Sequence, residues 1–284
     1  MIIVLTAEGI TQSYGGTVVL RGIDLEVNPG ETVGLIGPNG SGKTTLVRLL
    51  SGEETPDAGS VKLKGRELSA WSPRERARRV AVLPQEGLPP VAFTVEEVVT
   101  MGRHPHQGPW PWTGREDRKV VDQVLSQTSL ERERHQSVDR MSGGERQRVA
   151  IAKAMAQQPE LLILDEPTTF LDISHQLAIL DRIRSWQRKE GLAVLVVLHD
   201  LNLAAQYCDR LLMIQNGALV REGTPADVIQ SSAIREVYGV EPVIIPHPLT
   251  RIPQVLLRPE SVDRRSRLSK ESVSFSADSR YTFG

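Results

Sequence analysis

The feature that most constrains this chain is a glycine-rich segment, residues 37–44, which matches the pattern G-x-x-x-x-G-K-[ST]. The apolar segment 32–36 precedes it and predicts a buried strand, and residues 44–50 have the composition of a helix that ends at Gly52. Glycines let backbone N–H groups surround an anion, and the N-terminus of a helix adds partial positive charge. The sequence therefore predicts a strand, a phosphate-binding loop and a helix in direct succession.

The side chains of this loop indicate which phosphate compound it binds. Lys43 would place a positive charge between the β- and γ-phosphates of a nucleoside triphosphate, and the Thr44 hydroxyl is a ligand for Mg²⁺. We therefore expect the loop to bind ATP together with Mg²⁺. The residues expected to contact ATP here are Gly37, Pro38, Asn39, Gly40, Ser41, Gly42, Lys43, Thr44 and Thr45.

A second motif consists of an apolar strand that ends in two acids. Residues 161–164 are Leu-Leu-Ile-Leu, and Asp165 and Glu166 follow. Uncompensated burial of a carboxylate is costly, and the carboxyl edge of a parallel sheet faces the ligand crevice. We expect Asp165 to join the Mg²⁺ shell and Glu166 to act as the general base that activates the attacking water.

Strand and helix patterns alternate along most of the remaining chain. Alternating polarity over 2–12 and 23–27 predicts half-buried antiparallel strands near the N-terminus. Further strands are expected over 61–64, 80–83, 193–198 and, as a hairpin, 211–221. Helices are expected after Ser72, Thr94 and Thr224, and over 115–130, 142–157, 174–189 and 201–208. The alternation predicts an α/β fold with a mainly parallel sheet.

Composition excludes several classes of protein. The 284 residues include 34 basic and 35 acidic side chains, and this balance argues against a nucleic-acid binder that acts through strong positive charge. A single cysteine, Cys208, excludes an intrachain disulfide, and no apolar run approaches the ~20 residues of a membrane span. We expect one domain over 1–258 and a disordered or loosely packed tail over 259–284, where polar residues dominate.

Residues 141–148, Met-Ser-Gly-Gly-Glu-Arg-Gln-Arg, resemble the LSGGQ signature of ATP-binding cassette (ABC) ATPases. Met141 replaces the usual leucine and Glu145 the usual glutamine. In that family two subunits pair head to tail, and each signature caps the ATP that is bound to the other subunit. The resemblance therefore implies a homodimer in which Ser142, Gly143, Gly144 and Glu145 contact the partner's ATP.

Four other positions match the same family in chain order. Tyr14 resembles the aromatic residue that stacks on adenine, and Gln85 resembles the Q-loop glutamine that contacts Mg²⁺ and water. Asp172 stands in a segment that resembles the D-loop of the dimer interface, and His199 resembles the switch histidine near the γ-phosphate. Glu166, His199 and Gln85 are thus the expected catalytic residues, and Thr44, Gln85 and Asp165 the expected Mg²⁺ ligands.

The resemblance covers about residues 1–255 and implies a specific architecture. It predicts a P-loop NTPase core, an N-terminal antiparallel β subdomain and an inserted α-helical subdomain at about 86–157. Because one cassette is present, without heptads or membrane spans, we expect an ATPase subunit of an importer. Such a subunit docks on a polytopic permease through its helical subdomain and Q-loop, at the cytoplasmic face of the membrane. It meets a substrate-binding protein only indirectly and binds no nucleic acid.

The cargo is indicated only by resemblance. Segments 94–106 and 247–250 resemble importers of ferric siderophores, haem and cobalamin. An iron chelate or haem is the expected cargo, with cobalamin or another compound as the alternative. A non-transport ATP switch and a DNA-repair ATPase are the rival classes. We do not expect His104 and His106 to bind metal, because two histidines leave a metal shell incomplete; Trp110 and Trp112 fit either a permease contact or a local core.

Overall fold

The computed structural model describes residues 3–108, 114–169 and 171–257. The sequence analysis singles out Trp110, Trp112 and the tail over 259–284, which lie outside the described residues, as does Phe170, two residues before Asp172.

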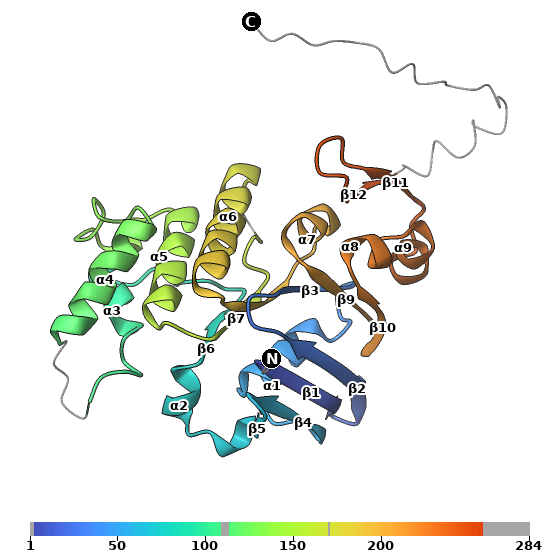
Figure 1. Cartoon of the computed structure of the whole chain (residues 1–284), viewed down its shortest axis with the longest axis horizontal. Coiled ribbons are helices and arrows are strands. Elements are labelled where there is room, and N and C mark those ends of the chain that lie inside the picture. Colours follow the sequence, from blue (N-terminus) through green and yellow to red (C-terminus); the bar gives the residue numbers. More distant parts are fainter. Residues whose placement is uncertain (1–2, 109–113, 170, 258–284) are drawn as a thin grey trace, which may run out of the picture.

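The centre of the molecule is a six-stranded sheet with the order β10-β9-β3-β8-β7-β6 (Figure 1). Its strands are β3 (Thr32–Ile36), β6 (Val80–Leu83), β7 (Leu161–Asp165), β8 (Ala193–Val197), β9 (Arg210–Gln215) and β10 (Ala218–Gly223). Neighbouring strands are parallel except for the β9–β10 hairpin, which is antiparallel. The predicted mainly parallel α/β sheet is confirmed. It brings the carboxyl ends of β3, β7 and β8 to one edge, because these three strands are neighbours and parallel.

A second sheet is antiparallel and has the order β2-β1-β4-β5. Its strands are β1 (Leu5–Tyr14), β2 (Thr17–Val27), β4 (Ala58–Leu63) and β5 (Arg66–Glu67). The pairing of β1 and β2 runs from Leu5 opposite Val27 to Tyr14 opposite Thr17, with irregularities between them. These irregularities interrupt the period-two pattern, so β2 begins at Thr17, well before the expected start at residue 23. Strand β1 is shifted from the expected 2–12 to Leu5–Tyr14.

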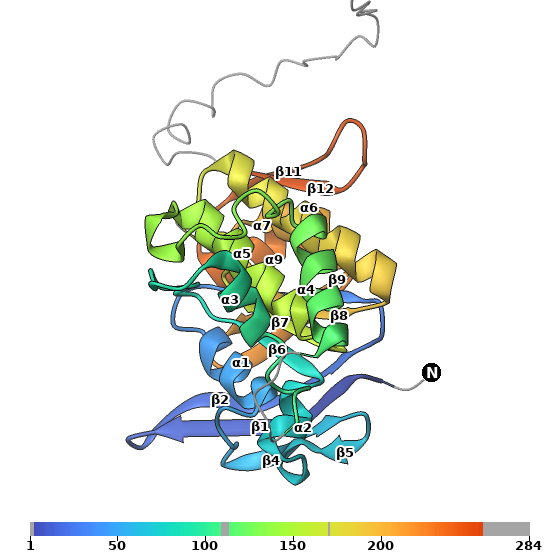
Figure 2. The ribbon, with the colours of Figure 1, turned by 90° about the vertical axis from the view of Figure 1, so that its left-hand side faces the viewer.

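Helix α1 (Lys43–Ser51) lies between the two sheets, as Figure 2 shows. Its buried residues Leu46, Leu49 and Leu50 belong to an apolar core shared by the antiparallel sheet and one face of the parallel sheet. The helix ends at Gly52, which has a φ of 75°, as the sequence predicts. Packing on both sides fixes the start of α1, and therefore also the loop that precedes it.

Helices on the other side of the parallel sheet, some over its face and some beside it, share a second core. These helices are α3 (Val95–Met101), α4 (Arg115–Gln127), α5 (Gly143–Ala156), α6 (Ile173–Glu190) and α7 (Leu201–Tyr207). The chain between β6 and β7 forms α3, α4 and α5, which pack together beside the sheet (Figure 1). Short helices α2 (Pro73–Ala77) and α8 (Pro225–Val228), and two 3-10 turns at Leu68–Ala70 and Val138–Arg140, complete the connections.

Helix caps explain why several of these helices begin where the sequence predicts. Reciprocal capping boxes open α2 at Ser72, α3 at Thr94 and α5 at Ser142. In each, the cap hydroxyl accepts a hydrogen bond from the backbone N–H three residues later, and that residue's carboxylate accepts one from the cap's backbone.

The C-terminal elements were not predicted. They are helix α9 (Ser231–Tyr238) and a hairpin of β11 (Pro242–Pro246) and β12 (Pro253–Leu257). Prolines stand at both ends of β11 and at the start of β12, and they weaken the strand signal in the sequence. Residues 247–250 form the turn of this hairpin, where His247 Nδ1 accepts hydrogen bonds from two backbone N–H groups. Among the described residues, no helix combines the length and the apolar character needed to cross a bilayer.

Candidate active site

The glycine-rich loop, residues 37–42, joins β3 to α1 and encloses the side chain of Lys43. Lys43 Nζ donates hydrogen bonds to the carbonyl oxygens of Gly37 and Pro38, each at 2.9 Å. Burial lowers the pKa of Lys43, an effect that the carboxylates of Glu166 and Asp165 oppose. A Cβ atom at Gly37 would lie 2.2 Å from the carbonyl oxygen of Ile214, so only glycine fits there. The loop is thus held close to the sheet with a cation at its centre.

The two predicted acids end β7 at the same edge of the sheet. Asp165 and Glu166 are both buried, and Glu166 has a φ of 51°, an unusual backbone conformation for a residue with a side chain. Glu166 Oε2 accepts hydrogen bonds from Gln85 Nε2 at 2.7 Å and from Thr169 Oγ1 at 3.2 Å. Glu166 Oε1 lies 2.5 Å from His199 Nε2. The carboxylate is thereby oriented by side chains from three separate segments.

The phosphate-binding loop shares one open cleft of about 360 Å³ with Gln85, Glu166 and His199. The cleft is lined by Val19, Asn39, Gly40, Gly42, Lys43, Thr44, Thr45, Gln85, Glu166 and His199. The structure therefore brings together the phosphate-binding loop and all three expected catalytic residues. Val19, on β2, and Thr169 were not singled out from the sequence, because an apolar strand residue and a lone threonine carry no motif of their own.

Asp165 has the environment of an incomplete metal site. Its Oδ1 atom is buried and has no hydrogen-bond partner. Burial, reinforced by the charge of Glu166, raises the pKa of Asp165, while a hydrogen bond from the side chain of Thr44 opposes that shift. A buried oxygen without a partner beside a threonine hydroxyl is the donor set that a hard divalent cation prefers. Thr44 and Asp165 therefore fit Mg²⁺, and Gln85 lines the same cleft.

Tyr14 is placed beside the cleft, not among the residues that line it. It ends β1, its side chain is 44% exposed, and its hydroxyl donates a hydrogen bond to Glu54. This hydrogen bond is the main cause that raises the pKa of Tyr14, and a hydrogen bond with Thr45 opposes it. The ring is thus held near the start of α1, next to the loop.

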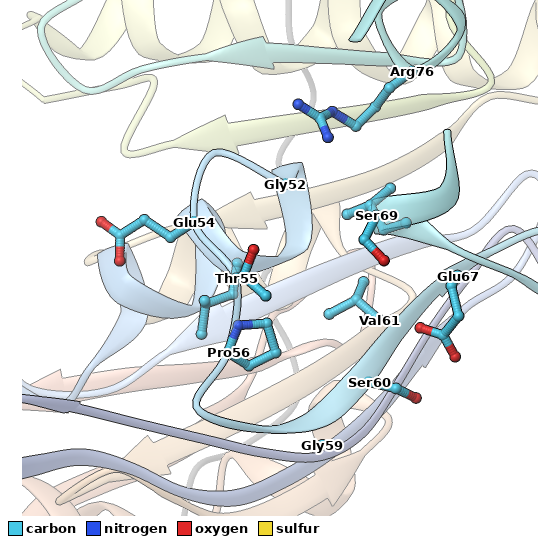
Figure 3. Close-up of a pocket in the computed structure, with 12 residues that line it drawn as sticks. Gly52, Glu54, Thr55, Pro56, Gly59, Ser60, Val61, Glu67, Ser69 and Arg76 are labelled. Atoms are coloured by element: carbon cyan, nitrogen blue, oxygen red, sulfur yellow. The ribbon is translucent and has the colours of Figure 1, made fainter. Parts of the chain in front are cut away.

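Glu54 also borders a separate hollow of about 130 Å³ between the end of α1 and β4 (Figure 3). Figure 3 shows Glu54 and Glu67 on opposite sides of this hollow, with Arg76 above it. The hollow is thus distinct from the cleft that holds Lys43.

The signature-like residues lie at the N-terminus of α5 and are not among the residues that line the cleft. Ser142 is exposed, and its backbone N–H and hydroxyl each donate to Glu145 Oε2 at 2.8 Å. These hydrogen bonds lower the pKa of Glu145. Within one subunit, therefore, the polar groups of Ser142 bond to its own capping box, and the signature loop does not line the cleft of the phosphate-binding loop.

Asp172, the expected D-loop residue, caps α6 and lies next to the signature loop. Its carboxylate accepts a hydrogen bond from the His175 backbone N–H at 2.9 Å and contacts the His175 ring at 2.8 Å. Hydrogen bonds from His175 and Ser174 lower the pKa of Asp172 to about 2. A Cβ atom at Gly144 would lie 2.6 Å from the His175 ring, so the two loops are in contact.

The two histidines that we did not expect to bind metal occupy different positions. His106 Nε2 lies 2.8 Å from the carbonyl oxygen of Gln157, whereas His104 borders a groove between α3 and α4. Among the described residues, no cluster of three metal-ligating side chains was found.

The phosphate-binding loop, the paired acids at the end of β7 and the glycine-rich start of α5 together define an ATP-binding cassette. The family described as "ABC transporter" matches residues 20–169, and the chain belongs to this family. Its members are the ATP-binding subunits of transporters and hydrolyse ATP. The resemblance inferred from the sequence is confirmed.

Individual relatives match nearly the whole described chain. The hemin import ATP-binding protein HmuV of Pseudomonas fluorescens is 45% identical over 260 residues, which cover 89% of this chain and 100% of the relative. The ferric enterobactin transport ATP-binding protein FepC of Escherichia coli is 38% identical over 252 residues, which cover 89% of this chain and 93% of the relative. A dimeric ATP-binding cassette bound to ADP and Pi is 28% identical, with a TM-score of 0.67, covering 78% and 98%.

Proposed function

We propose that this chain is the ATP-hydrolysing subunit of an importer for an iron chelate or haem. The observation that carries the proposal is the orientation of Glu166, which Gln85 and His199 hold at the mouth of the phosphate-binding loop. A carboxylate in this position serves as the general base for a water that attacks the γ-phosphate. His199 would hold the proton or the phosphate oxygen that faces it, and Lys43 would neutralise the phosphate charge.

Mg²⁺ would be held by Thr44 and Asp165, with Gln85 completing the shell. When bound, it would neutralise phosphate charge and orient the β- and γ-phosphates. Tyr14 would stack on the adenine, since it lies beside Thr45 at the start of α1. The backbone N–H groups of residues 39–42 would surround the phosphates.

The second half of each ATP site would come from a second copy of the chain. Ser142, Gly143, Gly144 and Glu145 present a helix N-terminus to the solvent, a geometry that suits an anion. In a head-to-tail dimer this surface would cover the ATP on the partner, with Asp172 at the interface. ATP binding would then close the dimer, and hydrolysis would reopen it.

The permease would dock in the groove between α3 and α4. This groove, of about 790 Å³, has an apolar part formed by Phe93, Met101 and Val121 and a charged rim that includes Glu96 and Arg134. Phe93 is 47% exposed. The groove belongs to the segment 86–157, which we propose moves as one helical subdomain that links the permease to Gln85. Such docking would hold the chain at the cytoplasmic face of the membrane.

The cargo proposal is supported by the relatives, which are named for hemin and ferric enterobactin import. Cobalamin or another chelate remains the alternative within the same mechanism. The test is growth of a deletion strain with haem or a ferric siderophore as the sole iron source. We expect growth to fail, and wild-type protein but not a Glu166→Gln variant to restore it.

The same growth experiment also tests the cargo, the docking groove and the importer class. A requirement for cobalamin in place of iron would reassign the cargo. Met101→Lys, which places a charge in the α3–α4 groove, should keep ATPase activity but fail to restore growth; full restoration would contradict docking in this groove. Normal growth of the deletion strain on every chelate would contradict the importer and favour a non-transport ATP switch.

A further inference from the structure

Gln147 is a buried polar residue on α5, one turn after the signature loop. Its side chain is 9% exposed, and its amide Nε2 donates a hydrogen bond to the carbonyl oxygen of Pro167 at 3.1 Å. Pro167 directly follows Glu166, so this hydrogen bond joins the helix of the signature to the turn of the proposed general base.

The turn that Gln147 contacts is strained. Glu166 has a φ of 51° and precedes a proline, a combination that backbone sterics disfavour. One hydrogen bond within the turn, from the Thr169 backbone N–H to the Glu166 carbonyl at 3.2 Å, supports this conformation. The amide Nε2 of Gln147 holds the next carbonyl group along the chain, that of Pro167. A strained backbone conformation persists only where several contacts hold it in place. The hydrogen bond from Gln147 is a contact of this kind, and it comes from outside the turn.

The other end of the same amide lies against the turn that carries Gln85. That turn is closed by a hydrogen bond from the Gly87 backbone N–H to the Pro84 carbonyl at 3.0 Å. A Cβ atom at Gly87 would lie 2.7 Å from Gln147 Oε1, and Gly87 has a φ of 62°. The positive φ favours glycine at this position, and a Cβ atom there would displace the end of the Gln147 side chain. One side chain therefore touches the two turns that bring Gln85 and Glu166 together.

We propose that Gln147 is a positioning residue for ATP hydrolysis, because it fixes the turns of Glu166 and Gln85 relative to α5, which begins at this subunit's own signature. The inference rests on the proposed roles of Glu166 and Gln85. In a dimer, the signature of one subunit would serve the partner's ATP while Glu166 acts on the subunit's own ATP. Gln147 would then connect the two ATP sites through a rigid contact within each chain.

A matched pair of variants separates positioning from stability. Gln147→Met keeps an unbranched side chain of similar length but removes the amide donor. Gln157→Met makes the same change at the other end of α5, where Gln157 Nε2 donates to the carbonyl oxygens of Val80, at 2.7 Å, and Ala77. Both variants lose a glutamine that joins α5 to a backbone carbonyl, but only Gln147 contacts the catalytic turns.

The experiment measures kcat, KM for ATP, affinity of the single subunit for a fluorescent ATP analogue, and thermal stability. For Gln147→Met we expect kcat to fall about tenfold, while KM and nucleotide affinity stay within about twofold of the wild type. Gln157→Met should keep kcat within about twofold at a similar or larger loss of stability. Unchanged kcat in Gln147→Met, or equal losses in both variants, would overturn the inference.

The proposed function is tested separately in the same assay. A wild-type chain without ATPase activity, or an active Glu166→Gln variant, would refute the proposed base whatever Gln147→Met does. As a second measurement, Gly87→Ala should reduce kcat less in the Gln147→Ala background than in the wild type. The new methyl group at position 87 would crowd the Gln147 side chain, and the shorter alanine at position 147 leaves room for it. Equal reductions in both backgrounds would contradict the contact.

Discussion

The cleft around Lys43 and the signature loop at Ser142 are the two regions that we propose to bind ATP phosphates, and they differ in how far one subunit buries their polar groups. In the cleft, Glu166 is buried and held by Gln85 and His199. At the signature, Ser142 is exposed, and its hydroxyl donates a hydrogen bond to Glu145 of the same capping box. In the proposed dimer, a single chain would therefore build the reacting half of an ATP site and present the other half to a second copy.

The comparison is tested most strongly by Glu166→Gln, which keeps the shape of the buried side chain but removes the proposed base. We expect kcat to fall by about 10²–10⁴-fold, the usual loss for a general base, with ATP binding intact. Because hydrolysis would no longer reopen it, the ATP-bound dimer should accumulate in size-exclusion chromatography. Glu160→Gln, at the opposite end of β7, is the matched control and should keep near-normal turnover. Near-normal turnover in Glu166→Gln would refute the assignment of the base.

The signature half is tested by Ser142→Arg, which places a bulky cation on the exposed helix start. We expect hydrolysis to fall by about 10²–10³-fold, as for the loss of a group that stabilises charge in the transition state. Binding of ATP to the isolated subunit should not change, because Ser142 is not among the residues that line the cleft. Loss of binding in the isolated subunit would show that the two regions are not separate.

Removing a charge should change the free energy of unfolding more in the buried cleft than on the exposed surface. Burial raises the pKa of Asp165 above 3.8, the ordinary value for an aspartate side chain. The folded chain therefore favours the protonated acid, a contribution that is present below pH 3.8 and is lost as pH rises through the folded-state pKa. At pH 7 without metal, Asp165→Asn should increase the free energy of unfolding by about 1 kcal/mol and flatten its dependence on pH. Exposed Asp139→Asn should have little effect. A less stable Asp165→Asn variant would show that the carboxylate is compensated.

The smallest effect is expected at Glu145, where the family usually has glutamine. Glu145→Gln replaces the carboxylate with an amide whose oxygen can still accept the capping hydrogen bonds, but it removes a negative charge from the surface that would face the partner's phosphates. In the Glu166→Gln background, we expect the ATP-bound dimer to dissociate at about two- to fivefold lower concentration, as measured by analytical ultracentrifugation. Weaker dimers would place Glu145 away from the phosphates.

Much of the fold followed from sequence because local signals agreed with tertiary structure. The strand 32–36, the helix start at Ser72 and the capping boxes at Thr94 and Ser142 match the prediction, since apolar runs and cap residues act locally. The hairpin β11–β12 was missed because prolines at its strand ends conceal it. Spacing alone also gave no sign of Gln147, because its partners Pro167 and Gly87 are distant in the chain and only the fold brings them to it.

The central claim is that each ATP site combines the loop of one subunit with the signature of another. It is tested most directly by mixing two inactive variants, Lys43→Ala and Ser142→Arg. A mixed dimer has one site with an intact loop and an intact signature, so random pairing should restore about a quarter of the wild-type ATPase rate. Activity no greater than that of the two variants measured separately would contradict the claim.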